Sequence, residues 1–382
     1  MMKRYYLLVC PALLALSSCS NEANENGILD KTDAISFAAY PTKSRAVDAD
    51  ITSDNMKGDN FGVAGYSNNA IYLNKGTNGV EQKWDARTWE YANLADLKFW
   101  PENNMDFYAY FPYTDNATFA TTNNDAGNST VMTIPNVDCS HDVLFAFAGN
   151  QSKQTRVPLT FHHAFSKIKT LQIEMPAEGI VYKSGCQVEI SSAEFIYTRT
   201  KGDVKVDKDG AASYNVAESN LTLKETLASA VTINSTNTST YIIDYGTSSK
   251  GYFFATSATK VNEVTGTGAL MWDGVKANIG ETSKLSTSGL VCLKLTCKVW
   301  NGTSHYYVGS ADTYGEVYIP LKGLDADSNG VSTFDAGKRY IYKIVMKDNV
   351  GFTDAGDPIL TPILFSVKSV DNWSDVTVTI TL

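Results

Sequence analysis

The stretch Asp106-Phe107-Tyr108-Ala109-Tyr110-Phe111-Pro112 decides the fold class of this 382-residue chain. Its aromatic and small apolar residues form a short run that ends at a proline, which is typical of a β-strand followed by a turn. Comparable short runs recur along the chain, at 34–40, 142–147, 167–175, 339–347 and 376–382. The run at 167–175 alternates between polar and apolar residues but shifts phase in its middle. The sequence therefore predicts an all-β fold.

Turn residues separate these runs. Val204 and Val206 lead into Asp207-Lys208-Asp209-Gly210, which predicts a hairpin turn. No stretch has convincing helical amphipathicity, and the best short candidate is 93–99. So many short strands fit two β-sandwiches in tandem better than one large barrel. We expect the boundary within 149–167 and assign 46–160 to the first sandwich and 161–382 to the second.

Composition limits the possible functions. Hydrophobic residues make up 43% of the chain and charged residues 19%, which is below the ~25% usual for soluble domains. The net charge of −9 leaves no basic footprint for a phosphate backbone, so we expect no nucleic-acid partner. The wealth of Tyr, Thr, Val and Asn indicates β-structure in an extracellular protein.

The first residues read as a targeting segment. Lys3 and Arg4 precede an apolar stretch, 5–16, that is too short to span a bilayer and is typical of a secretory signal. It ends in Leu16-Ser17-Ser18-Cys19, which resembles a bacterial lipobox. We expect cleavage between Ser18 and Cys19, a signal peptide of residues 1–18, and a lipid on Cys19 that anchors the protein in the outer membrane. The alternative is an ordinary signal peptide with a chance cysteine.

Residues that could carry catalytic or metal chemistry are sparse. His162 and His163 are adjacent on a strand-like stretch, so they point to opposite faces and do not readily share a metal. Four cysteines remain after residue 19, at 139, 186, 292 and 297, and we expect buried, unreactive thiols. No nucleophile with a base, no phosphate loop and no zinc-type spacing is present, so we predict neither an enzyme nor a cofactor.

One segment partly matches a calcium loop. Asp325, Asp327 and Asn329 occupy its first, third and fifth positions, and Gly330 its sixth. The twelfth position holds Ala336 instead of the glutamate that completes such a loop. We favour a solvated turn, with calcium binding as the alternative.

Several motifs occur in the order in which the fimbrillin family, the subunits of Bacteroidales (type V) pili, carries them. They are the lipobox, a strand, an arginine processing site, Phe61-Gly62-Val63-Ala64-Gly65-Tyr66, Phe99-Trp100-Pro101, 106–112, 142–146, 157–168, 336–342 and 370–373. Each motif is short, but the ordered set spans nearly the whole chain. The sequence therefore resembles this family.

The resemblance implies a structural subunit of a cell-surface fimbria, at its stalk or tip, that serves adhesion. It implies two transthyretin-like β-sandwiches after a removable segment, 19–45, that contains the first strand. An Arg-specific surface protease would cut after Arg45 and leave Ala46 as the new N-terminus. Other pilin subunits would be the partners.

The C-terminal segment 376–382 is the candidate donor strand. Val376, Val378, Ile380 and Leu382 alternate with threonines, so the segment can bury one face in a neighbour's groove by β-augmentation. The alternative is an ordinary last strand of the second sandwich.

Two other functions stay open. If Arg45 is never cut, the protein would be a membrane-retained pilus anchor. It could also be a lipidated glycan-binding surface protein that uses Trp84, Trp89 or Trp300 as a sugar platform.

Overall fold

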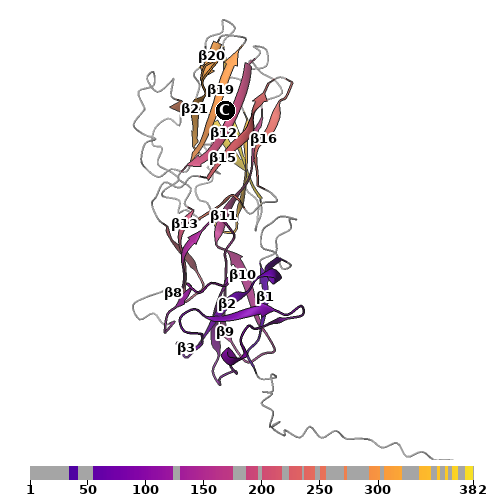
Figure 1. Ribbon diagram of the computed structural model, residues 1–382. Coiled ribbons are helices and arrows are strands. Elements are labelled where there is room, and N and C mark those ends of the chain that lie inside the picture. Colours follow the sequence, from indigo (N-terminus) through magenta and orange to yellow (C-terminus); the bar gives the residue numbers. More distant parts are fainter. Residues whose placement is uncertain are drawn as a thin grey trace, which may run out of the picture.

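The computed structural model of the chain is drawn in Figure 1. It describes residues 34–41, 55–123, 130–174, 186–196, 200–216, 223–234, 236–245, 250–254, 271–272, 292–301, 305–320, 335–345, 351–352, 358–359, 364–368 and 375–381. Within these ranges the regular elements are β-strands and two single-turn 3₁₀ helices, η2 (Asn55–Gly58) and η3 (Leu94–Asp96), which confirms the all-β prediction. The short candidate at 93–99 forms only η3. No helix of the described chain is long and apolar enough to cross a membrane.

An eight-stranded sheet forms the lower end of the molecule in Figure 1. Its strands, in spatial order, are β1 (Phe37–Pro41), β10 (Val157–His163), β9 (Leu144–Gln151), β6 (Met105–Phe111), β2 (Phe61–Ser67), β4 (Val80–Trp84) and β5 (Trp89–Tyr91). The eighth strand, β3 (Ala70–Leu73), pairs with β2. The two strands at the ends of this order, β1 and β5, also contact each other, so the sheet curls until its edges meet.

Both faces of this sheet are buried. Along β6, Phe107 and Ala109 belong to a cluster inside the curl, whereas Tyr108 and Tyr110 belong to a second cluster on the outer face. Side chains alternate between the two faces of a strand, so a stretch with apolar residues at every position serves two cores at once. That is why 106–111 lacks polar residues after Asp106.

A four-stranded sheet covers the outer face. Its order is β14 (Ala212–Val216), β13 (Lys201–Asp207), β8 (Thr130–Asp138) and β7 (Thr118–Phe119). The predicted hairpin at 207–210 is confirmed, because it joins β13 to β14. β13 also pairs with β8, so a segment near the middle of the chain completes a sheet that begins at β7. The division into two tandem sandwiches at residue 160 stays a prediction. With that boundary, β13 would belong to the second sandwich although it pairs with β8 of the first.

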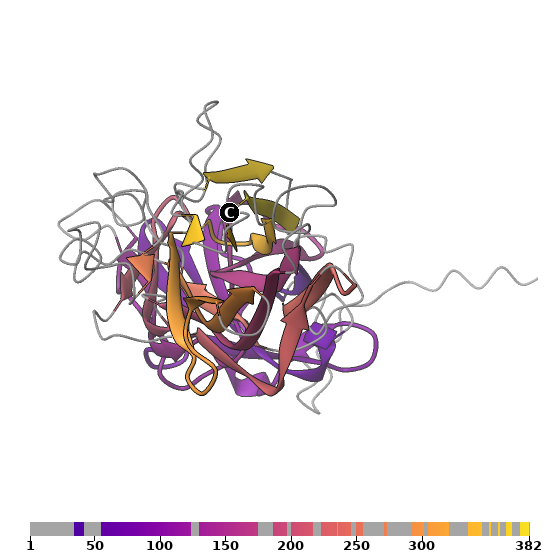
Figure 2. The ribbon, with the colours of Figure 1, turned by 90° about the horizontal axis from the view of Figure 1, so that it is seen from above.

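Two six-stranded sheets form most of the upper part. One has the order β16 (Ser239–Asp244), β11 (Phe165–Glu174), β22 (Arg339–Val345), β26 (Asp375–Thr381) and β25 (Leu364–Lys368), with β17 (Tyr252–Phe254) paired to β11. The other has the order β15 (Leu223–Ile233), β12 (Cys186–Ile196), β19 (Cys292–Asn301), β21 (Gly315–Pro320) and β18 (Met271–Trp272), with β20 (His305–Val308) paired to β19. A small hairpin, β23 (Gly351–Phe352) with β24 (Pro358–Ile359), completes the set. Seen from above, the strands overlap in one compact outline, so the molecule is elongated along the vertical of Figure 1 (Figure 2).

β11 confirms the phase shift predicted within 167–175. Its register slips between Ile168 and Thr170 against β22, and between Leu171 and Gln172 against β16. A bulge inserts one residue and moves the following side chains to the other face, which is what the broken alternation indicates.

The glycine of the Phe-Gly-Val stretch in β2 makes room for a buried tyrosine. A Cβ atom on Gly62 would lie 2.3 Å from the Tyr110 ring. The Tyr110 hydroxyl reaches across this space and donates to the carbonyl of Asn78 or Thr114, at 2.9 and 2.8 Å. Only a residue without a side chain allows this close approach.

Candidate functional site

The first strand, β1, closes the seam of the curled sheet. It pairs in parallel with β10, from Phe37 opposite Val157 to Pro41 opposite Phe161. On its other side it contacts β5 without a strand ladder. β1 is therefore an edge strand that is held by one neighbour and by its side chains.

Side chains of residues 34–41 fill the core inside the curl. Ile35 and Phe37 are completely buried. The Phe37 ring meets Phe107 edge-on at a centroid distance of 5.4 Å and Phe61 at 6.3 Å. Burying two such side chains contributes about 1.5–3 kcal/mol each.

Main-chain and hydroxyl contacts fix the approach to β1. The Ile35 amide donates to the Lys98 carbonyl at 2.9 Å, and the Val157 amide donates to the Ser36 carbonyl at 2.8 Å. The Ser36 hydroxyl donates to the Thr155 carbonyl at 2.5 Å. These bonds join the two residues before β1 to segments that are distant in sequence.

The candidate donor segment is a strand of its own sheet. β26 runs parallel to β22, with Val376 opposite Tyr340, and antiparallel to β25, with Val378 opposite Val367. It therefore lies between two strands and is not a free tail. The side chains of β26 and the residue Leu382 are not among the described parts of the chain.

The other predicted processing and metal residues also lie outside the described part. They are Ser18, Cys19, Arg45 and Ala46 at the N-terminal end, and Asp325, Asp327 and Asn329 of the calcium candidate. Pro41, the last residue of β1, lies four positions before Arg45.

The two neighbouring histidines face opposite sides, as predicted. His162 is exposed, whereas His163 is buried and its Nδ1 lies 2.6 Å from the Asp142 carboxylate. Among the described residues, no group of three His, Cys, Asp or Glu side chains is arranged to hold a metal. Cys139 and Cys297 are buried free thiols, and burial raises the pKa of the Cys297 thiol to about 12.

A cleft lies beside β1. It has a volume of about 220 Å³ and is lined by Phe37, Ala38, Ala39, Tyr40, Lys57, Trp84, Arg87, Thr88, Trp89 and Arg156. Trp84 and Trp89 pack edge to face at 5.6 Å, and the Lys57 ammonium lies 5.1 Å from the centre of the Trp84 ring. The third predicted platform, Trp300, instead stacks on Tyr306 at 6.0 Å. Sequence patterns indicate the two tryptophans of the cleft but miss Lys57 and Arg156, which are far from them in the chain.

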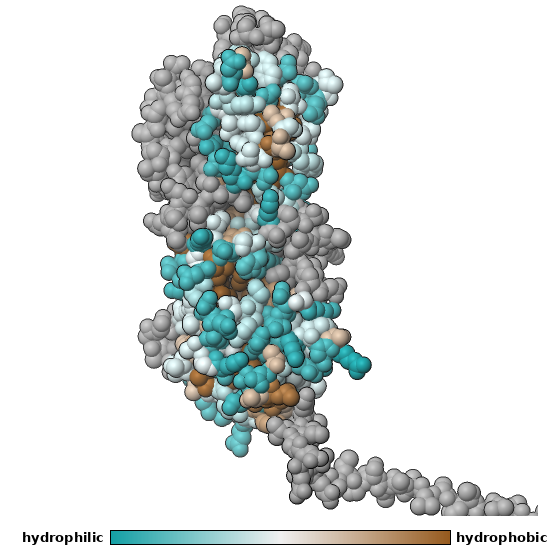
Figure 3. All heavy atoms as spheres, in the orientation of Figure 1, coloured by the Kyte–Doolittle hydropathy of each residue, from teal (hydrophilic) through white to brown (hydrophobic). Residues whose placement is uncertain are grey.

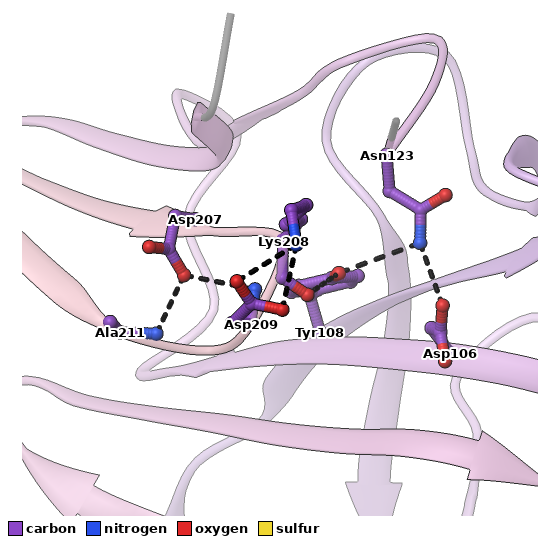
Figure 4. Close-up of polar contacts among 7 residues, drawn as sticks. All are labelled: Asp106, Tyr108, Asn123, Asp207, Lys208, Asp209 and Ala211. Atoms are coloured by element: carbon purple, nitrogen blue, oxygen red, sulfur yellow. Dashed lines mark hydrogen bonds and ion pairs between the residues drawn. The ribbon is translucent and has the colours of Figure 1, made fainter. Parts of the chain in front are cut away.

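A polar cluster joins the β13–β14 turn to β6 (Figure 4). The Tyr108 hydroxyl donates to the Lys208 carbonyl at 2.7 Å, and the Asn123 amide donates to Asp106 at 2.8 Å. The Asp207 carboxylate accepts the amides of Asp209 and Ala211 at 2.9 and 2.8 Å. These groups form hydrogen bonds with each other and with the main chain. The cluster therefore fixes the β13–β14 hairpin against β6.

Known proteins include relatives of this chain. A family model described as fimbrillin-like matches residues 44–357. A comparison with curated proteins returned no match. The family match covers most of the chain.

Solved structures similar to the chain include the fimbrilin FimA of Porphyromonas gingivalis, with 11% identity, 92% of this chain and 97% of that chain covered, and a TM-score of 0.38. A Parabacteroides distasonis protein described in terms of cell adhesion has 10% identity, 91% and 96% coverage and a TM-score of 0.45. A Bacteroides uniformis protein with a similar description has 13% identity, 91% and 98% coverage and a TM-score of 0.38.

Proposed function

Since this chain belongs to the fimbrillin-like family, we propose that it is a stalk or tip subunit of a cell-surface fimbria that polymerises by strand exchange. The observation that carries the proposal is the state of β1, an edge strand whose buried side chains fill the core of the eight-stranded sheet. An edge strand with a buried face is the element that one subunit can lose and another can replace.

The proposed route begins at the membrane. Residues 1–18 direct export, and a lipid on Cys19 holds the subunit in the outer membrane at the cell surface. Residues 19–45 then link the anchor to the folded sheets, and they contain β1.

Cleavage after Arg45 would separate β1 from the rest of the chain. The strand would then be retained only by its ladder with β10, its hydrogen bonds and the burial of Ile35 and Phe37. Its release would expose Phe61 and Phe107, which now contact Phe37. The exposed core and the unpaired edge of β10 together form a groove for an incoming strand.

The C-terminal segment has the spacing that this groove requires. Ile35, Phe37 and Ala39 contribute to the core at every second position of the leaving strand. Val376, Val378, Ile380 and Leu382 repeat apolar residues at the same interval. The strand period of two then lets one apolar face replace the other. To act as a donor strand, β26 would have to separate from β22 and β25. The exchange would then replace its hydrogen bonds to these two strands with hydrogen bonds to β10 of the next subunit.

The proposal is tested by digesting the Cys19→Ala chain, which cannot be lipidated, with an Arg-specific protease. We expect a new N-terminus at Ala46 by mass spectrometry and a heat-sensitive ladder on a denaturing gel. The control is Arg45→Ala, which should give neither.

A clean cut with monomer only would contradict polymerisation by this chain. Resistance at Arg45 would point to a membrane-retained anchor instead.

A further inference from the structure

The cleft beside β1 gathers positive charge on an acidic protein. Lys57 comes from η2, Arg87 from the turn between β4 and β5, and Arg156 from the segment before β10. Among the residues that the structure describes, no carboxylate lines the cleft, although the whole chain has a net charge of −9. Arg87 and Arg156 come from two separate segments and line one small space, which favours an anionic ligand.

The two arginines are available to a ligand. Both are exposed, although the Arg87 guanidinium is close enough to the Asp85 carboxylate to contribute to lowering the pKa of that carboxylate. The nearby Asp85 carboxylate accepts the main-chain amides of Thr88 and Arg87, both at 3.2 Å. Those amide hydrogen bonds, Thr88 first, lower the pKa of Asp85, so this carboxylate is ionised and serves the turn.

Backbone strain lies next to Arg87. Ala86 has a φ of +71°, a conformation that residues with a Cβ atom rarely adopt. Ala86 lies in the tight turn of the β4–β5 hairpin, where a positive φ matches the twist of the two strands. The turn places Arg87 in the lining of the cleft.

The remaining walls are aromatic. Tyr40, which is 55% exposed, lines the cleft together with Trp84 and Trp89. An aromatic ring with a polar tip offers a flat apolar face together with a hydrogen-bonding group, which suits the mixed surface of a sugar ring. The volume of about 220 Å³ is below the ~300–1,000 Å³ of sites for drug-sized ligands, so it would admit one sugar unit of a longer chain.

We propose that this cleft binds an acidic saccharide, with the carboxylate of a uronic acid between Arg87 and Arg156 and the sugar ring against Tyr40. The planar guanidinium fork matches a carboxylate in two parallel hydrogen bonds and keeps its charge at any relevant pH. Figure 3 shows one face of the molecule, where hydrophilic and neutral residues surround apolar patches near the middle and at the lower end.

The site has a consequence for processing. Tyr40 lies on β1, so release of that strand would remove one wall of the cleft. This consequence rests on the proposed cleavage, whereas binding to the uncut chain does not. If the cleaved protein bound the ligand as tightly as the uncut protein, the role of Tyr40 in the cleft would be contradicted. The proposal that the protein is a fimbrial subunit would be unaffected.

The direct test is calorimetric titration of the uncut Cys19→Ala chain with trigalacturonic acid. We expect saturable binding that weakens as salt is added. Arg87→Ala and Arg156→Ala should each raise the Kd by about tenfold or more, because each removes a charge-assisted contact. Lys83→Ala is the matched control: it removes an exposed cation of β4 outside the cleft and should change the Kd by less than about twofold.

Three further probes test the ligand class. Maltotriose has sugar rings without carboxylates, citrate has carboxylates without rings, and triglutamate is an acidic peptide. We expect each to bind at least about tenfold more weakly than trigalacturonic acid, a difference of about 1.4 kcal/mol. Equal binding of citrate or triglutamate, or arginine variants that bind normally, would overturn the proposal. Unchanged thermal unfolding of each variant shows that it is folded.

Discussion

Phe37 and Tyr40 lie three residues apart on β1 and have opposite surroundings. Phe37 is completely buried among Phe61 and Phe107, whereas Tyr40 is 55% exposed beside the cleft. A strand directs successive side chains to opposite faces, so one short segment both fills a core and borders a surface site. Separate substitutions can therefore test the two roles.

Phe37→Ala should lower the free energy of unfolding by about 3–5 kcal/mol, because it removes a buried ring and leaves a cavity that the surrounding side chains fill only in part. Tyr40→Ala, on the same strand, should change it by no more than about 0.5 kcal/mol, because its side chain is mostly in water. Both values come from chemical denaturation followed by tryptophan fluorescence. Equal effects of the two substitutions would contradict the placement of β1.

Individual strands can be predicted from the sequence because their signals are local. β6 begins one residue before the predicted range and ends where predicted, and β22 begins where predicted. The irregularity in β11 is visible as a broken alternation. In each case the pattern of polar and apolar residues within the strand indicates which of its faces are buried.

Partners could not be predicted, because alternation carries no information about the neighbouring strand. Ser36 and Thr155 are 119 residues apart in sequence, yet they bond where β1 reaches β10. β13 joins β8 across a wide gap in the chain as well. The cleft could not be predicted for the same reason, since Lys57 and Arg156 are distant in sequence and line one cleft only in the folded chain.

The β13–β14 turn depends on a glycine that packs against β9. Gly210 has a φ of +82°, and a Cβ atom there would lie 2.5 Å from the Phe147 ring. Gly76 has a φ of +59°, but a Cβ atom there would meet nothing within 4 Å. Substitution of Gly76 by alanine would therefore cost only the free energy of the left-handed backbone conformation.

Gly210→Ala should therefore destabilise the protein more than Gly76→Ala. We expect about 1–2 kcal/mol for Gly76→Ala, from left-handed strain. Overpacking should add about 1–3 kcal/mol for Gly210→Ala. The difference between the two unfolding free energies isolates the contact of the hairpin with β9, and equal values would show that the turn does not dock there.

At the scale of the whole molecule, buried tyrosines recur in the interior from one end to the other. The chain has 21 tyrosines, and several of them are large side chains with almost no exposed surface. Burial raises the pKa of tyrosines at both ends of the molecule: Tyr66, Tyr91, Tyr108, Tyr110, Tyr214, Tyr245, Tyr340 and Tyr342. Ionisation of these tyrosines would therefore destabilise the packing around them.

Alkaline pH should unfold the molecule for this reason. In the unfolded chain a tyrosine loses its proton near pH 10, whereas in the folded chain burial raises the pKa of Tyr113 to about 12 and those of the buried tyrosines further. The stabilisation is fully present below about pH 10 and is lost as the pH rises through the folded values, because ionisation then favours the unfolded state. We expect the 295 nm absorbance of the exposed tyrosines to rise first, without a change in far-UV circular dichroism. The absorbance of the buried tyrosines should rise at higher pH, together with the loss of the circular dichroism signal. In guanidinium, the same absorbance should change near pH 10. Complete titration near pH 10 with unchanged circular dichroism would show that the tyrosines are not held in these cores.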